Sequence, residues 1–165
     1  MKLKQNLLST FLVVALFAVG ATSPVFADDA APVSAYVKPN ITHESYGDLK
    51  VVVPLTNDML LPMKLRNIAN LLKAVDVWGG KVDVKVVMYA KGLAWLKTPD
   101  DKLKAQLDML RNHGVQFVAC NNSLIENGID FHTLYGVKES DVVPSGFGEV
   151  AFLQARKGYV VDPGM

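Results

Sequence analysis

The sequence predicts an α/β fold, a three-layer α/β/α sandwich with about five mostly parallel strands. Two observations support this prediction. From Leu49 onward, short apolar runs alternate with segments whose apolar residues recur every three or four positions, which is typical of a parallel sheet covered by helices. The run Val82–Tyr89 is also almost continuously apolar, as expected of a strand buried on both faces.

For the first part of the domain, the sequence predicts a strand, a helix and a second strand, in that order. Leu49–Val53 is the first strand, and Pro54 closes it because proline lacks an N–H for the strand ladder. The turn at Gly79-Gly80 leads to the second strand, Val82–Tyr89. Between them, four apolar residues fall at helical spacing on one face: Leu61, Leu65, Ile68 and Leu72.

A second helix follows a strong start signal. Thr98 is the expected N-cap, Pro99 suits the first helical position, and Asp100 and Asp101 complement the helix dipole. Gly114 ends the helix. Its apolar stripe is Leu103, Leu107 and Leu110.

The remaining elements continue the alternation. Val115–Cys120 is the third strand, and a short helix after it ends near Gly128. A short strand is expected at about Asp141–Val143, then a helix at Ser145–Lys157 and a fifth strand at Tyr159–Val161. Crossovers between neighbouring parallel strands should be right-handed.

Residues 1–27 read as a secretory signal peptide. Lys2 and Lys4 precede an apolar run from Leu7 to Ala21, and Val25-Phe26-Ala27 fits a cleavage signature. We therefore expect export across the inner membrane, most simply to the periplasm, and no stable membrane insertion after cleavage. Residues 28–48 lack lasting periodicity and are interpreted as an N-terminal arm or linker, so that residues 49–165 form one domain.

Charge and cysteine content exclude several classes of protein. Removing Lys2 and Lys4 with the signal changes the net charge from +1 to −1, which argues against nucleic-acid binding. A single cysteine, Cys120, cannot form an internal disulfide. It is an inert buried residue, half of an intermolecular disulfide, or a working thiol.

Cys120 is the predicted catalytic residue because of its position. It stands where the third strand runs into a helix start, and the free N–H groups there favour thiolate over thiol. Asn121, Asn122 and Ser123 are candidate binding residues beside it, and any of them could cap the helix. If Ser123 is the cap, the dipole acts less strongly on the sulfur.

Ligands of open parallel sheets bind beyond the carboxyl ends of the strands, which nominates three more binding residues. Gly92 could let the backbone approach a ligand, and Trp95 could form a pocket wall, although an aromatic residue in an apolar run more often belongs to the core. Gly146 lies at the corner after the fourth strand.

No metal or organic cofactor is expected. His43, His113 and His132 are scattered without paired spacing, so a zinc site is not predicted. His132 could assist Cys120, but a surface imidazole is the simpler interpretation. Gly146-Phe147-Gly148 lacks the third glycine of the dinucleotide fingerprint.

Several stretches carry a resemblance to a known family. They are Leu65–Leu72, Val118–Leu124, Gly128–Asp130, Val143–Gly146, and Leu153–Tyr159 with Pro163. These stretches resemble the DsrE/DsrF-like sulfur-relay family, and the likeness spans about residues 49 to 163, with the carboxyl half the more specific part.

The resemblance implies a flavodoxin-like subunit that forms homo- or hetero-oligomers. It also implies that Cys120 accepts sulfane sulfur as a persulfide and passes it to a partner, which could be a protein or a small thiol. The chain would then be an exported sulfur carrier or sulfurtransferase. The alternative is a non-catalytic oligomeric binding or scaffold module in which Cys120 is buried and inert.

Overall fold

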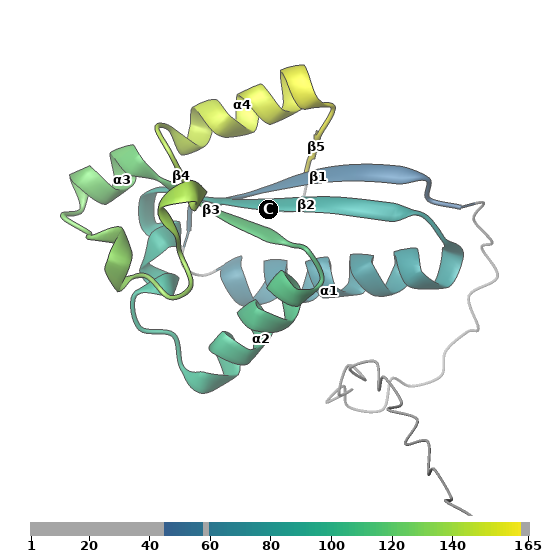
Figure 1. Ribbon diagram of the computed structural model, residues 1–165, viewed down its shortest axis with the longest axis horizontal. Coiled ribbons are helices and arrows are strands. Elements are labelled where there is room, and N and C mark those ends of the chain that lie inside the picture. The colour runs from purple at the N-terminus through teal and green to yellow at the C-terminus, as the bar shows by residue number, and fades with distance from the viewer. Residues whose placement is uncertain (1–44, 58–59, 163–165) are drawn as a thin grey trace, which may run out of the picture. The chain divides into compact units, whose positions relative to one another are not determined.

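A computed structural model describes residues 45–57 and 60–162. It forms a five-stranded sheet in the order β4-β3-β2-β1-β5, and every neighbouring pair is parallel (Figure 1). The expected α/β sandwich of five strands is therefore confirmed. The expected signal peptide, residues 1–27, and almost all of the expected arm, residues 28–48, lie outside the described residues.

The strands differ greatly in length. The two central strands pair along their whole length, from Asp48 opposite Lys81 to Leu55 opposite Met88, whereas the two edge strands have two residues each. The strands are β1 (Asp48–Leu55), β2 (Lys81–Met88), β3 (Gln116–Cys120), β4 (Val142–Val143) and β5 (Val160–Val161).

Helices cover both faces of the sheet. In Figure 1, α1 and α2 lie on one face and α4 lies on the other. None of the helices within residues 45–57 and 60–162 has the length and apolar character needed to cross a membrane. The helices are α1 (Leu61–Trp78), α2 (Asp101–Asn112), α3 (Asn121–Glu126) and α4 (Gly146–Lys157), with 3₁₀ turns η2 (Ala90–Leu96), η3 (Phe131–Thr133) and η4 (Glu139–Asp141).

The start of α2 differs from the sequence prediction. Asp100, not Thr98, is the N-cap, and its side chain accepts a hydrogen bond from the backbone N–H of Leu103 at 2.7 Å. Pro99 consequently precedes the helix. Thr98 and Asp100 are both suitable N-cap residues. A carboxylate caps a helix as well as a hydroxyl does and adds a favourable charge at the positive end of the dipole, which explains why the helix begins after Asp100.

The core has two parts because alternate strand residues face opposite sides of the sheet. In β1, Val53 packs on the α1 and α2 face, whereas Val52 packs on the α4 face with Val150 and Leu153. The same alternation separates Phe117 from Val118 in β3. Burial on both faces explains why the later parts of β1 and β2, Val51–Val53 and Val86–Met88, are continuously apolar.

One buried ion pair joins α1 to the end of the sheet. The Lys64 side chain is 3% exposed, and its ammonium lies 2.5 Å from the Asp162 carboxylate. The backbone N–H of Asp162 donates to the carbonyl of Val52 at 2.8 Å, which fixes this partner beside β1. A charge this well covered is stable only with a partner.

We predict that Asp162→Ala destabilises the protein by about 3 kcal/mol, because it leaves the Lys64 charge buried without its carboxylate. Lys64→Met should cost much less, since it removes the buried charge itself. Urea unfolding at neutral pH measures both. Asp101→Ala, which breaks the surface pair with Lys104, is the control and should cost the least. Equal losses for Asp162→Ala and Asp101→Ala would contradict the prediction.

Candidate functional site

Cys120 is the last residue of β3 and lies opposite Val143 of β4. It therefore stands at the carboxyl edge of the sheet, as its position in the sequence predicts. Its side chain is nevertheless well covered, with a relative exposure of 4%. Any reagent therefore reaches the sulfur only after a local movement of the segments around it.

Cys120 itself is the N-cap of α3, with extended backbone angles of φ −81° and ψ 117°. The sequence left the cap open between Asn121, Asn122 and Ser123, and these residues instead form the first turn of the helix. The sulfur thus occupies the place where a serine or aspartate oxygen normally accepts from the first-turn N–H groups. The Cys120 side chain makes no capping hydrogen bond to them.

Two opposing effects set the acidity of this thiol. Burial alone would raise the pKa of Cys120, since it removes water from the charged form. The Ser123 hydroxyl and the backbone N–H groups of Ser123, Gly146 and Asn122 act in the opposite direction, and the net pKa lies below the ordinary value for cysteine. Donors from two helices, α3 and α4, therefore make this thiol more acidic than an ordinary cysteine.

Ser123 connects this site to the neighbouring loop. It is buried, and its Oγ accepts from the backbone N–H of Ala90 at 2.9 Å. Ala90 is the one non-glycine residue of the described chain with a positive φ, 49°. The hydroxyl that accepts from Ala90 remains free to donate its own proton toward a thiolate at Cys120.

The other predicted binding residues have different surroundings. The side chains of Asn121 and Asn122 are exposed, and the Asn122 N–H donates to the carbonyl of Pro144 at 3.3 Å. Gly92 is buried, and a Cβ there would lie 2.1 Å from the carbonyl oxygen of Leu55, so its small size serves close packing of two backbone segments. Trp95 is half-buried against the core of the α1 and α2 face.

Gly146 is, with Ser123, a predicted residue that the structure brings to the thiol. It begins α4, its N–H helps to lower the pKa of Cys120, and a Cβ on it would lie 2.8 Å from Cβ of Tyr89. A larger residue at this position would displace the side chain of Tyr89.

Sequence reasoning missed Tyr89, which follows β2 at this same edge. Burial raises its pKa, and the negative charge of Cys120 raises it further, so it stays a neutral phenol near the sulfur. No sequence signal distinguishes it from the apolar strand that precedes it.

The two histidines in the described part of the chain, His113 and His132, do not join this site. The Nδ1 of His132 lies 2.7 Å from the Asp130 carboxylate on an exposed turn, and His132 is absent from the groups that act on the Cys120 pKa. His113 is the C-cap of α2, with Nδ1 2.8 Å from the carbonyl of Met109. His43 lies outside the described residues. Within residues 45–57 and 60–162, no three histidine, cysteine or carboxylate side chains gather as metal ligands would.

The chain is thus an α/β/α protein with a single thiol at the carboxyl edge of its sheet, where it lies near the first turns of α3 and α4. The chain belongs to the DsrE/DsrF-like family, whose model matches residues 60–163. A solved structure with a similar fold is the protein of unknown function MTH1491 from Methanobacterium thermoautotrophicum, with a TM-score of 0.56 and 24% identity over 70% of this chain and 97% of that one. At this identity the likeness concerns the fold alone. No curated protein matches the sequence.

We predict that Gly146→Ala destabilises the protein by about 1–3 kcal/mol, because the added methyl group collides with Tyr89. Gly148→Ala in the same helix turn is the matched control. There the methyl would meet only Ser145 at 3.3 Å, and the higher helix propensity of alanine offsets the cost of that contact. Thermal and urea unfolding compare the two variants, and equal stability would show that the tyrosine contact is readily relieved.

We also predict that Ser123→Ala raises the pKa of Cys120. The hydroxyl stabilises the thiolate, so its removal moves ionisation to higher pH. Ultraviolet absorbance of the thiolate measures the midpoint without requiring access to the sulfur. Asn121→Ala is the control and should leave the midpoint unchanged, since Asn121 does not act on this pKa. A shared midpoint in wild type, Ser123→Ala and Asn121→Ala would contradict the prediction.

Proposed function

We propose that this protein is a sulfur carrier that accepts sulfane sulfur as a persulfide on Cys120 and passes it to a partner. The observation that supports the proposal is the set of donors from α3 and α4 that lowers the pKa of the thiol despite its burial. Membership of the DsrE/DsrF-like family points to sulfur relay as the general role.

The chemistry requires one thiol. The Cys120 thiolate attacks a sulfur atom of a polysulfide, the new Sγ–S bond forms, and the donor S–S bond breaks with its electron pair leaving on the departing sulfur chain. An acceptor thiolate then attacks the outer sulfur, and Cys120 leaves as a thiolate. Both steps conserve the number of sulfane sulfur atoms and need no external oxidant.

The proposal extends to partners. Ile125 of α3 and Phe147 of α4 are 70% and 72% exposed, and they belong to the two helices whose first turns surround the thiol. We propose that homo-oligomer formation or a sulfur donor or acceptor uses this apolar surface, and that docking accompanies the movement that uncovers Cys120. Export to the periplasm, proposed from residues 1–27, would place the relay outside the cytoplasm.

A second candidate is a non-catalytic oligomeric scaffold with an unreactive cysteine. The 4% exposure of Cys120 favours it, because a sealed thiol neither accepts sulfur nor reacts with alkylating agents. The two candidates therefore differ in one measurable property, the reactivity of the thiol in the folded protein.

Mass spectrometry of the native protein after treatment with inorganic polysulfide tests the proposal. The expected result is a gain of one or more sulfur atoms that is lost on addition of a small thiol, as the second transfer step requires. Cys120→Ser should show no gain.

Two controls distinguish lack of access from lack of chemistry. Asn121→Ala should retain the adduct, because its exposed side chain makes no contribution to the thiolate. Polysulfide treatment in urea exposes the sulfur in either case. An adduct that forms only in urea, with no native alkylation by iodoacetamide, would exclude a carrier that loads directly from polysulfide and would support the scaffold.

A further inference from the structure

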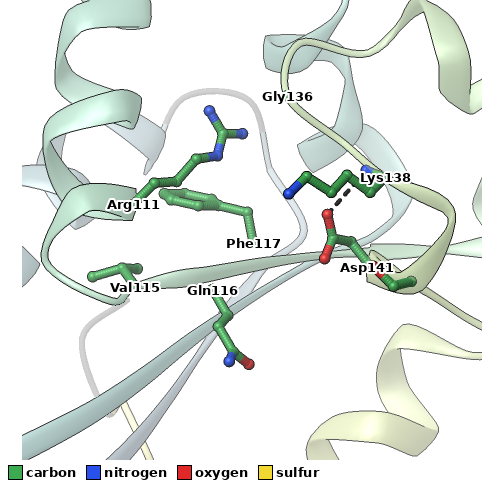
Figure 2. A pocket seen from close by; sticks show the side chains of 8 residues that line it. Arg111, Val115, Gln116, Phe117, Gly136, Lys138 and Asp141 are labelled. Carbon is green, nitrogen blue, oxygen red and sulfur yellow. Dashed lines mark hydrogen bonds between the residues drawn. The ribbon is translucent and has the colours of Figure 1, made fainter.

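A cavity of about 430 Å³ lies at the opposite end of β3 from Cys120. It is bounded by the start of β3, the end of α2 and the chain from Gly136 to Asp141 (Figure 2). Its volume falls within the range of about 300 to 1,000 Å³ that small-molecule sites occupy. Gln116 lies four positions before Cys120, which is about 13 Å along a strand, so this cavity is distinct from the thiol site.

Arg111 lines the cavity in a fixed position. One guanidinium nitrogen donates to the carbonyl of Tyr135 at 3.0 Å, and the other lies 3.3 Å from the Asp108 carboxylate. The guanidinium also stacks over the ring of Phe117, 5.1 Å from its centroid. Because these contacts use only part of its five N–H donors, the group retains donors for a ligand.

Gly136 makes this position of Arg111 possible. A Cβ at Gly136 would lie 2.7 Å from Cζ of Arg111, and the residue has a φ of 66°. A side chain at this position would move the guanidinium and would also strain a backbone with positive φ, so glycine favours the observed position of Arg111.

Lys138 brings a second positive charge to the same cavity. Figure 2 shows its side chain extending toward Phe117 and Arg111. Among the described residues it has no ion pair. Two cations that face one space repel each other unless an anion lies between them.

The remaining polar groups fit an anion only in part. Ser140 offers a hydroxyl to the cavity, whereas Asp141 contributes one negative charge. The Asp141 carboxylate accepts the backbone N–H of Lys138 at 2.9 Å, drawn as the dashed line in Figure 2. A second carboxylate, Asp108, lies 3.3 Å from the Arg111 guanidinium, so the two cations face two carboxylates. The case for an anion rests on geometry, since the planar fork of arginine matches the oxygen atoms of a phosphate or sulfate group.

We propose that this cavity is a second ligand site, which binds a small metabolite through a phosphate or sulfate group held by Arg111 and Lys138. The volume exceeds what the anionic group alone needs, so the rest of the ligand lies against the Phe117 side of the cavity. The proposal is independent of the sulfur chemistry at Cys120.

Titration of the isotope-labelled protein with inorganic phosphate at constant ionic strength, followed by amide NMR, tests the site. Saturable shifts are expected at Arg111, Gly136, Lys138 and Ser140. Sulfate should reproduce them, and acetate should bind more weakly, because one carboxylate carries less charge than a tetrahedral dianion.

Three variants keep the test selective. Lys138→Gln, at an exposed position, should weaken phosphate binding about tenfold through the loss of one charge-assisted contact. Lys102→Gln, the same charge change at an exposed position of α2, should leave it unchanged. Asp141→Asn keeps an acceptor for the Lys138 N–H but removes the opposing charge, so it should tighten binding.

Unsaturable shifts, or equal weakening in Lys138→Gln and Lys102→Gln, would overturn the proposal and indicate general screening of surface charge. Tighter binding of acetate than of phosphate would overturn the assignment of the anionic group. Neither result would affect the reactivity of Cys120.

Discussion

The two-residue pairing of β4 with β3 is the constraint on which the candidate thiol site depends. Ala119 lies opposite Val142 and Cys120 opposite Val143, and the chain then turns through Pro144 into α4. This short ladder brings the N–H of Gly146 to a sulfur 26 residues earlier in the chain. The first turn of α3 supplies the other backbone donors, so two helix starts act on a single atom.

The site combines burial with stabilisation of charge, two effects that normally oppose each other. A buried thiol surrounded only by apolar groups would remain protonated and inert. Around Cys120, the Ser123 hydroxyl and three backbone N–H groups offset the loss of water. The neutral phenol of Tyr89 lies near the sulfur, and Gly146 packs closely against Tyr89.

The segment from Lys138 to Gly146 contributes to both ends of β3. Its first residues line the cavity beside Arg111, its middle forms β4, and its last residue donates toward Cys120. The two sites remain separate in their chemistry, since one presents the side chains of Arg111 and Lys138 and the other presents a thiol whose pKa is lowered. They share a segment whose position depends on a very short strand pairing.

Much of the fold could be predicted from the sequence because its signals are local. Apolar periodicity identified the strands and helices, and continuous runs such as Val82–Tyr89 indicated burial on both faces. The family resemblance, carried mainly by the carboxyl half, is confirmed by the family model. The position of Cys120 at a strand end also followed from sequence alone. The N-cap residues were predicted less well. Asp100 rather than Thr98 caps α2, and Cys120 rather than one of the three residues after it caps α3.

What the tertiary structure decided depends on residues far apart in the chain. The strand order, the contact of Gly146 with Tyr89 and the hydrogen bond from Ala90 to Ser123 all join separate elements, and no local pattern encodes them. The same holds for the 4% exposure of Cys120 and for the convergence of Arg111 and Lys138 on one cavity. Sequence periodicity reports which face of an element is buried, whereas a site requires knowing which elements meet there.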